Sequence, residues 1–296
     1  MICEKPFVRG KTAHGCGSCL PCRIRKRAVW SHRMMLESSL YSDNCFVTLT
    51  YRQPEFGPPD MSLRPRDLQL FLKRLRKAHA PDRLRFYACG EYGEKSHLPH
   101  YHLAIFNFPT CQYGRSRFKR RQNCCASCDT IRDCWPHGFV DVGTLEINSA
   151  QYVAQYVTKK MTSKDDPRLD GRHPEFARMS NRPGIGHDAM HFIASQLLSV
   201  EHEGDVPSVL LHGRRPLPLG RYLTRKLRLF VTGKEDLPDD VVLAIEEKLR
   251  PMREAAFSAP VAWGKEKIFS NLLADAAAPK IASMKSRAAI FKKGSL

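Results

Sequence analysis

Two histidines one residue apart, His100 and His102, stand at the start of the apolar run PHYHLAIF. Alternate side chains of a β-strand share a face, so both imidazoles would project together, about 7 Å apart along the chain. Imidazoles placed in this way can share one metal cation, while Tyr101 and Leu103 point into the opposite layer. The alternative is two polar residues on a half-buried strand whose ring nitrogens are satisfied elsewhere.

Two tyrosines and two lysines form a second set of reactive residues in QYVAQYVTKK. Tyr152 and Tyr156 are one helical turn apart and therefore lie on one face of a helix, with Lys159 and Lys160 one turn beyond. Cations so close to a phenolate suit attack on a phosphodiester, because they stabilise the anionic oxygen and the charge that develops on phosphorus. The alternative is that both rings pack at the edge of the core.

Strands and helices are expected to hold these residues. Runs rich in β-branched and aromatic residues predict strands at 45–51, 84–93, 98–106 and 138–147. Helices are predicted at 23–40, 63–80, 148–161 and 239–256. The apolar residues of the second helix recur at i, i+3, i+4 and i+7, namely Leu68, Phe71, Leu72 and Leu75. In the third helix Asn148 or Ser149 is the expected N-cap, and the apolar stripe that would pack on the sheet is Ala150, Val153, Ala154, Val157 and Met161.

Charge points to a polyanionic partner. The 296 residues include 48 Lys and Arg against 30 Asp and Glu, a net charge of +18. Such an excess favours nucleic acid or an anionic membrane surface. No apolar run approaches the roughly 20 residues of a spanning helix, and the N-terminus has no apolar core of a secretory signal, so nucleic acid is the expected partner.

The 11 cysteines are clustered, which favours metal binding over disulfides in a reducing compartment. Cys16, Cys19 and Cys22 form C-x2-C-x2-C, for which Cys3 or His14 is the candidate fourth zinc ligand. A second candidate zinc group is Cys111, Cys125, Cys128 and Cys134. The alternatives are reduced buried cysteines, or one metal shared by the two groups.

The motifs together resemble a known family. An apolar strand, an H-x-H strand and a Y-x3-Y-x2-K-K helix occur in the order found in HUH endonucleases that start rolling-circle replication. The closer resemblance is to replication initiation proteins of the small single-stranded DNA phages, the gokushovirus-like microviruses. The residues that carry it are CGSCLPCR (16–23), FVTLTY, GEYG with PHYHLAIF, WPHGFVDVG, YVAQYVTKK and NRPGIG, which span a little over half the chain.

The resemblance implies a metal-dependent endonuclease that nicks and rejoins single-stranded origin DNA. His100 and His102 would hold Mg²⁺ or Mn²⁺, with Glu91 as the candidate third ligand and Glu94 or His97 as alternatives. Tyr152 or Tyr156 would attack the phosphate to leave a 5′-phosphotyrosine and a free 3′-OH, and Tyr156 is favoured if only one acts. Basic segments would track the DNA; the expected residues are Arg23, Arg25, Lys26, Arg27, Arg115, Arg117, Lys119 and Arg120, with Phe118, Tyr113 or Trp30 to stack on bases.

The expected fold is α+β: a mostly antiparallel sheet of about five strands, with helices packed on one face. The H-x-H strand would be central and face the tyrosine helix. An endonuclease domain is predicted over 1–190, with the N-terminal Cys cluster (1–23) and a Cys-rich basic insertion (107–137). An accessory, partly helical region with a disordered basic tail (285–296) would follow over 191–296.

Partners and alternatives complete these expectations. The predicted partners are origin DNA and the polymerase and helicase of the host, in the bacterial cytoplasm. No G-x4-G-K-[ST] phosphate loop is present to drive unwinding. The alternatives are a plasmid-type HUH initiator, a single-strand transposase, or a zinc-stapled nucleic-acid-binding protein without catalysis.

Overall fold

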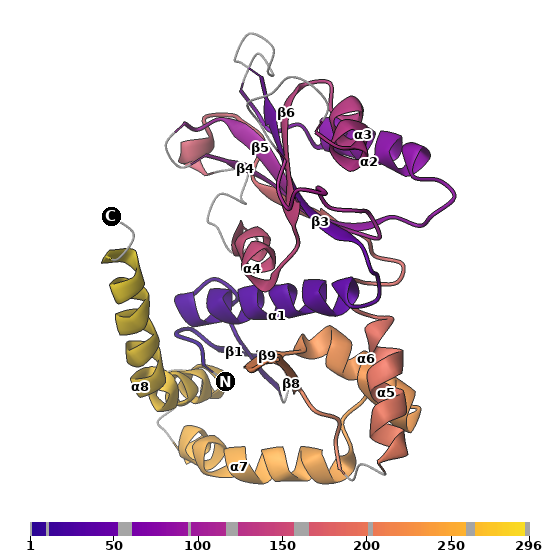
Figure 1. Cartoon of the computed structure of the whole chain (residues 1–296). Helices are drawn as coiled ribbons and strands as arrows, with labels where there is room; N and C mark the ends of the chain where they lie inside the picture. The colour runs from indigo at the N-terminus through magenta and orange to yellow at the C-terminus, as the bar shows by residue number, and fades with distance from the viewer. Residues whose placement is uncertain are drawn as a thin grey trace. The chain divides into compact units, whose positions relative to one another are not determined.

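The structure, a computed structural model, describes residues 2–9, 12–52, 61–93, 96–116, 124–156, 166–200, 204–258 and 264–293. Its contacts divide the chain into two units. The sheet unit comprises residues 27–202 and 207–233, and the terminal unit comprises residues 1–26, 203–206 and 234–296. Figure 1 shows the elements of both units.

A five-stranded antiparallel sheet forms the centre of the sheet unit. Its strands are β3 (Asn44–Tyr51), β4 (Arg85–Tyr92), β5 (Pro99–Phe106), β6 (Gly138–Thr144) and β7 (Phe176–Met179), in the order β6-β3-β5-β4-β7. All four neighbouring pairs are antiparallel. The predicted α+β class, the antiparallel sheet and the four predicted strands are confirmed. The fifth strand, β7, lies in a segment that was expected to be a loop.

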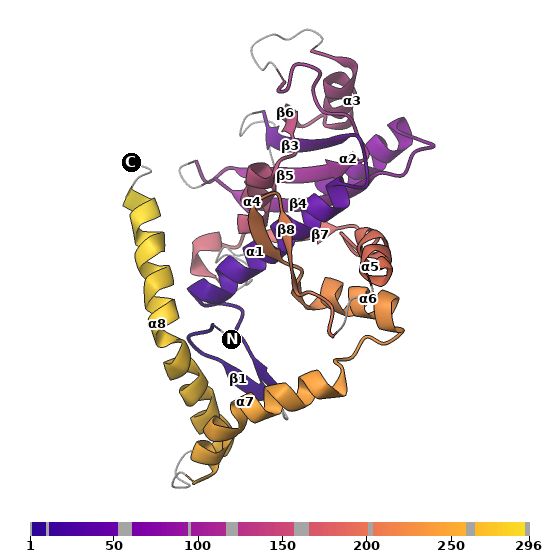
Figure 2. The same ribbon diagram turned by 60° about the horizontal axis from the view of Figure 1, so that its bottom comes forward.

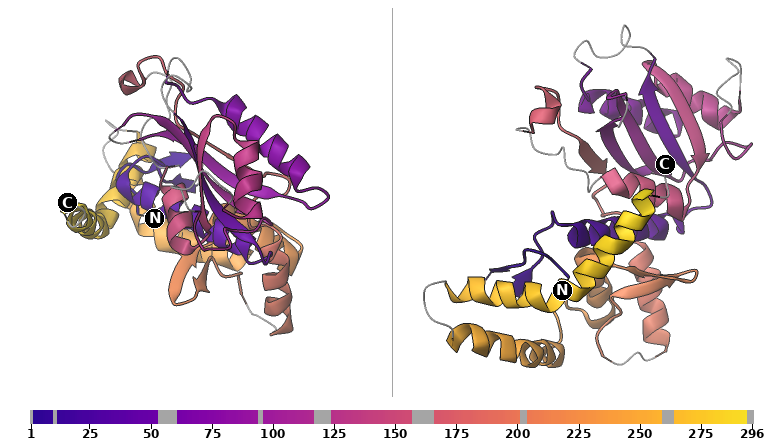
Figure 3. Two further views of the ribbon diagram at one scale, coloured as in Figure 1. Left: turned by 45° about the horizontal axis from the view of Figure 1, so that its top comes forward. Right: turned by 90° about the vertical axis from the view of Figure 1, so that its left-hand side faces the viewer.

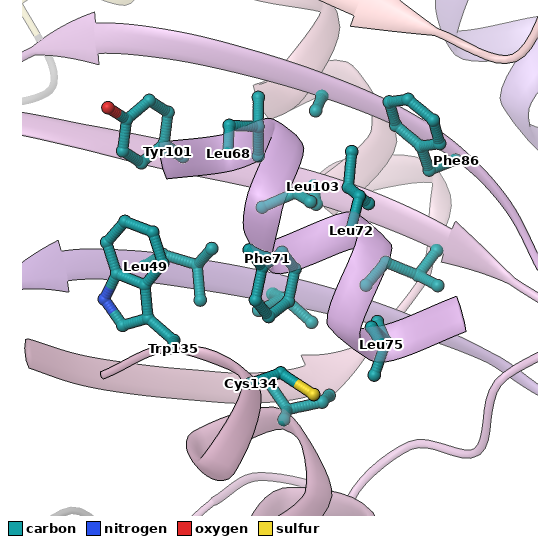
Figure 4. Close-up of a cluster of buried hydrophobic side chains, with 14 of the residues drawn as sticks. Leu49, Leu68, Phe71, Leu72, Leu75, Phe86, Tyr101, Leu103, Cys134 and Trp135 are labelled. Atoms are coloured by element: carbon teal, nitrogen blue, oxygen red, sulfur yellow. The ribbon is translucent and has the colours of Figure 1, made fainter. Parts of the chain in front are cut away.

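One face of the sheet is covered by α2 (Pro65–Ala78) and by α3 (Ala126–Cys134). The predicted apolar stripe of α2 is buried there against Val47, Leu49, Leu103 and Ile105 of the strands. Figure 4 shows these side chains between α2 and the sheet, with Trp135 and Cys134 beside them. The periodicity of α2 therefore predicted its buried face correctly.

The other face is covered as well, by α4 (Ile147–Tyr156) and by the part of α1 (Leu20–Ser38) that belongs to the sheet unit. Ala150, Val153 and Ala154 of α4 and Met34 of α1 pack on Ala104 and Phe106. Figures 1 and 3 show both helices on the same side of the sheet. The expectation of helices on one face is wrong, because all eight residues of β4 are buried and both faces must be shielded from water.

The N-cap of α4 also differs from the expected one. The helix begins at Ile147, and Ala150 N donates to Glu146 O at 2.8 Å, so Glu146 precedes the first turn. Ser149 accepts from Glu146 N at 2.8 Å, which satisfies a backbone donor at the entry to the helix. The expected stripe residues Val157 and Met161 lie outside the described residues.

The NRPGIG segment fastens α1 to the sheet unit. Glu37 of α1 accepts from Gly186 N at 2.6 Å and pairs with the buried Arg85 of β4. Arg85 in turn donates to Pro183 O at 3.0 Å. Gly186 has φ of +79°, a conformation that favours glycine. The unit continues with η1 (Pro167–Leu169), α5 (Ala189–Ser199), β8 (Val209–His212), β9 (Arg215–Pro218) and α6 (Gly220–Thr232).

The terminal unit combines both ends of the chain. It contains the hairpin β1 (Phe7–Arg9) and β2 (Thr12–His14), and the helices α7 (Asp239–Ser258) and α8 (Lys265–Lys293). Helix α8 contacts both α7 and β1, as Figure 2 shows, and Lys285 Nζ lies 3.1 Å from Glu4 Oε1. The tail expected to be disordered is therefore helical over 285–293, whereas α7 agrees with the predicted helix.

The two units do not divide the chain at residue 190. Helices α5 and α6 join the sheet unit, and the N-terminal cysteines join the terminal unit. A functional division at residue 190 stays a prediction. Within the described ranges, no helix is long and apolar enough to cross a membrane.

Candidate metal and tyrosine site

Three side chains predicted to bind a metal meet on one face of the sheet. Glu91 Oε1 lies 2.7 Å from His100 Nε2 and 3.1 Å from His102 Nε2. The register explains the meeting: Glu91 of β4 stands directly opposite His100 of β5, and His102 follows on the same face. Of the alternative ligands, His97 is exposed and outside this group, and Glu94 lies outside the described residues.

The far nitrogens of both imidazoles are held by other groups. His100 Nδ1 lies 3.1 Å from Leu98 O, which can only accept, so Nδ1 carries the proton. His102 Nδ1 lies 3.0 Å from Thr48 Oγ1 of β3. With Nδ1 donating in each ring, each Nε2 is left to face the carboxylate, which is the usual arrangement of histidines that bind metals.

The carboxylate of Glu91 is buried and ionised. Only 2% of Glu91 is exposed, and His102 is 5% exposed. Burial raises the pKa of Glu91, but its hydrogen bonds to His100 and His102 and their charges outweigh burial and hold the pKa below its ordinary value. A buried anion beside two imidazole nitrogens needs a proton or a cation between them. Two nitrogens and one carboxylate oxygen are a donor set that divalent metals accept.

Tyr152 stands beside this group. Its ring centroid lies 5.0 Å from that of His102, with the rings nearly perpendicular at 83°, and Phe46 stacks on the other side of His102 at 5.8 Å. The neighbours of Tyr152 on α4 anchor the helix in the core, while Tyr152 itself is 43% exposed. The prediction that the H-x-H strand is central and faces the tyrosine helix is confirmed for this residue.

The other members of the tyrosine motif are less fully described. Tyr156 is the last residue of α4, one helical turn beyond Tyr152, and its side chain lies outside the description. Lys159 and Lys160 lie outside the described residues. Their roles stay predictions.

The first cysteine group gathers as expected in the terminal unit. The Sγ atoms of Cys3, Cys16, Cys19 and Cys22 lie within 4.8 Å of one another. Cys3 is thus the fourth member rather than His14, whose ring stacks on Phe7. Burial raises the pKa of the Cys16 thiol, but hydrogen bonds from Ser18 and the Cys19 backbone outweigh it and lower the pKa to about 6.

The second cysteine group differs by one member from the expected set. Cys111, Cys124, Cys125 and Cys128 have their Sγ atoms within 4.8 Å of one another. Cys134 is instead buried in the apolar core between α2 and the sheet. It is the last residue of α3, nearly two turns beyond Cys128, whereas Cys124 directly precedes Cys125.

Some of the predicted DNA-binding residues are engaged within the protein. Arg115 forms an ion pair with Asp141 at 2.6 Å, and Trp30 packs on Tyr87 with Arg33 over its ring. On α1, Arg25 and Lys26 are exposed, and Arg23 and Arg27 are half-buried; Tyr113 is exposed. The remaining predicted residues, Arg117, Phe118, Lys119 and Arg120, lie outside the described residues.

Sequence patterns missed two supporting residues, Thr48 and Phe46. Both lie on β3, where their alternation with Val47 and Leu49 places them on the face of His102. Their contacts depend on the pairing of β3 with β5, in which Thr48 is opposite His102. The spacing of residues along one strand carries no signal for that pairing.

Comparison with known proteins places this site within a matched segment. Residues 44–161, from β3 to beyond α4, match a family model of phage replication-associated proteins, the ORF2 family. The chain is 34% identical over 169 residues to replication-associated protein VP4 of Bdellovibrio phage phiMH2K, covering 55% of this chain and 53% of that protein. It is 35% identical over 180 residues to replication-associated protein ORF2 of Spiroplasma virus 4, covering 58% and 55%.

A third relative matches more of the chain at lower identity. Replication-associated protein ORF4 of Chlamydia phage 1 is 24% identical over 241 residues, covering 79% of this chain and 57% of that protein. The chain thus spans little more than half the length of these relatives. No solved structure matches it. The resemblance predicted from the sequence is confirmed: the chain is similar to the microvirus-like replication-associated proteins of small phages, and residues 44–161 match the ORF2 family model.

Proposed function

We propose that this chain starts phage DNA replication by nicking and rejoining single-stranded origin DNA through a phosphotyrosine. The observation that carries the proposal is the meeting of Glu91, His100 and His102 on the sheet face where Tyr152 contacts His102. The names of the three relatives support a role in phage replication.

The donor set of Glu91, His100 and His102 fits Mg²⁺ or Mn²⁺. When bound, such a cation supplies charge that polarises the scissile phosphate and neutralises its oxygens. Glu91 and the two imidazoles would hold it, and Thr48 and the Leu98 carbonyl would keep both rings oriented.

A tyrosine hydroxyl of α4 would make the attack. The phenolic oxygen forms a bond to phosphorus and loses its proton, while the bond from phosphorus to the 3′ oxygen breaks and that oxygen gains a proton. One phosphodiester replaces another, so the step needs no external energy source. The free 3′-OH can be extended by a polymerase of the host, and attack by a 3′-OH on the phosphotyrosine reverses the step.

Two tyrosines suit a cycle with two cuts. While one tyrosine carries the first 5′ end, the other must cut the regenerated origin. Tyr152 and Tyr156 are separated by about 5–6 Å along the helix axis, so each can approach the same phosphate in turn. Lys159 and Lys160 would stabilise the phenolate from the following turn.

The surroundings of this reaction are proposals too. Exposed Arg25 and Lys26 would contact DNA phosphates, a host helicase would supply unwinding, and the reaction would take place in the bacterial cytoplasm. A plasmid-type initiator or a single-strand transposase would use the same chemistry on another DNA. The two four-cysteine groups favour a second candidate of another class, a zinc-stapled binding protein without catalysis.

A cleavage assay on circular single-stranded DNA of the cognate genome with Mn²⁺ tests the proposal. We expect a protein–DNA adduct that survives denaturation, persists in Tyr152→Phe or Tyr156→Phe, and disappears in the double variant. Tyr41→Phe is the matched control, because it removes a phenol on the same face away from the site. Tight DNA binding without an adduct in any variant, across several divalent metals, would instead support the binding protein.

A further inference from the structure

A basic cavity lies at the opposite end of β4 from Glu91. Its volume is about 350 Å³, and it is formed where the end of α2, the start of β4 and the segment after β7 come together. The residues that line it include Arg76, Asp82, Arg83, Arg85, Ser180 and Arg182. Four guanidinium groups thus share one cavity with a single carboxylate of the lining.

Three of these arginines are not neutralised. Within the described part of the chain, none of Arg76, Arg83 and Arg182 forms an ion pair with a carboxylate. Arg83 donates to Arg182 O at 2.8 Å, and Arg76 lies over the ring of Phe86 at 5.2 Å. Clustered cations without counter-charges attract an anion, and guanidinium groups match the oxygens of phosphate.

The fourth arginine offers a buried donor. Arg85 is 1% exposed; its Nε pairs with Glu37, and its Nη2 donates to Pro183 O. Its Nη1 is buried and has no hydrogen-bond partner among the described residues. An unpaired buried N–H costs free energy, so an acceptor that enters this cavity is stabilised.

We propose that this cavity binds a phosphate group of the single-stranded DNA on which the enzyme acts; this assignment rests on the proposed function. Arg85 and Glu91 are six residues apart on β4, roughly 20 Å along a strand. The phosphate held here is therefore not the scissile one but a neighbour several nucleotides away. Contact at both ends of β4 fixes the direction of the DNA strand across the sheet unit.

Binding without cleavage tests this site. The affinity of a fluorescent single-stranded oligonucleotide from the origin is measured in EDTA over a range of chloride concentrations. We expect Arg83→Gln/Arg182→Gln to weaken binding about 5-fold to 10-fold and to reduce the slope of log K against log salt by about 0.7, the value for one single-strand phosphate. Arg66→Gln/Arg221→Gln is the control, because both arginines are exposed, the charge change is equal and neither lines the cavity.

A second arm identifies the source of the phosphate. Thermal unfolding is measured with inorganic phosphate against chloride at equal ionic strength, and circular dichroism checks the fold of each variant. A reduced DNA slope supports the proposal, whether or not cleavage occurs in the tyrosine assay. A phosphate-dependent rise in Tm that the variant loses, with DNA binding unchanged, overturns DNA as the source and leaves a free phosphate. No difference from the control in either arm overturns the site itself.

Discussion

At the scale of single residues, the hydrogen bond between Thr48 and His102 carries the next prediction. Thr48→Val keeps the shape of the side chain but removes the acceptor that holds His102 Nδ1 at 3.0 Å. The ring is then free to rotate or to place its proton on Nε2, which competes with a metal. We expect Mn²⁺ affinity to fall about 10-fold to 100-fold, as is typical when a ligand loses its outer partner. Isothermal titration with Mn²⁺ measures this loss.

Thr50→Val is the matched control for Thr48→Val. Thr50 lies two residues along β3, on the same face, and its hydroxyl has no hydrogen bond to an imidazole in the described structure. Equal Mn²⁺ affinity in both variants and the wild type would show that Thr48 does not orient the ligand.

Residue types and spacing along one strand predicted part of this site. The H-x-H pair shares a face because of strand alternation, and Glu91 follows from a short connection between two antiparallel strands. Thr48 could not be predicted, since its contact depends on which strand pairs with β5 and in what register. The choice of Cys124 over Cys134 likewise depends on where α3 begins.

At the scale of elements, amphipathic pattern was informative where one face alone is buried. Helix α2 was predicted with its buried residues because its other side is polar. Strands β4 and β5 are buried on both faces, so no alternation indicated that α1 would pack on the second face. Strand β7 has four residues and too little pattern to stand out from the polar segment around it.

The buried pair of Glu37 and Arg85 predicts how firmly α1 is held to the sheet unit. Glu37→Ala would leave the Arg85 guanidinium without its counter-charge and Gly186 N without its acceptor. Removal of one partner of a buried pair typically costs about 3–5 kcal/mol. We expect the free energy of unfolding to fall by about that amount in urea titrations followed by tryptophan fluorescence.

A surface pair in the same unit gives the comparison for Glu37→Ala. Asp129 and Arg132 are paired on α3 at 2.7 Å but are partly exposed, so Asp129→Ala should cost only about 0.3–0.5 kcal/mol. If Glu37→Ala proves as mild as Asp129→Ala, the pair does not fasten α1.

At the scale of the whole molecule, each unit contains its own group of four thiols. Cys3, Cys16, Cys19 and Cys22 belong to the terminal unit, and the group around Cys128 belongs to the sheet unit. Four thiolates suit tetrahedral Zn²⁺, and small elements around such a site depend on the metal for their folding. We therefore expect two zinc ions per chain, one in each unit, rather than one ion shared by the two groups.

Single cysteine variants test this stoichiometry by native mass spectrometry, in a His100→Ala background that prevents zinc from binding the imidazole site. Cys16→Ser and Cys124→Ser should each reduce the count from two zinc ions to one, because each removes one of four ligands. Cys134→Ser should retain both ions, since this thiol lies in the apolar core away from either group. Loss of a zinc ion in Cys134→Ser but not in Cys124→Ser would restore the ligand set expected from the sequence. A count of one that either Cys16→Ser or Cys124→Ser abolishes would instead require that the two groups share one metal.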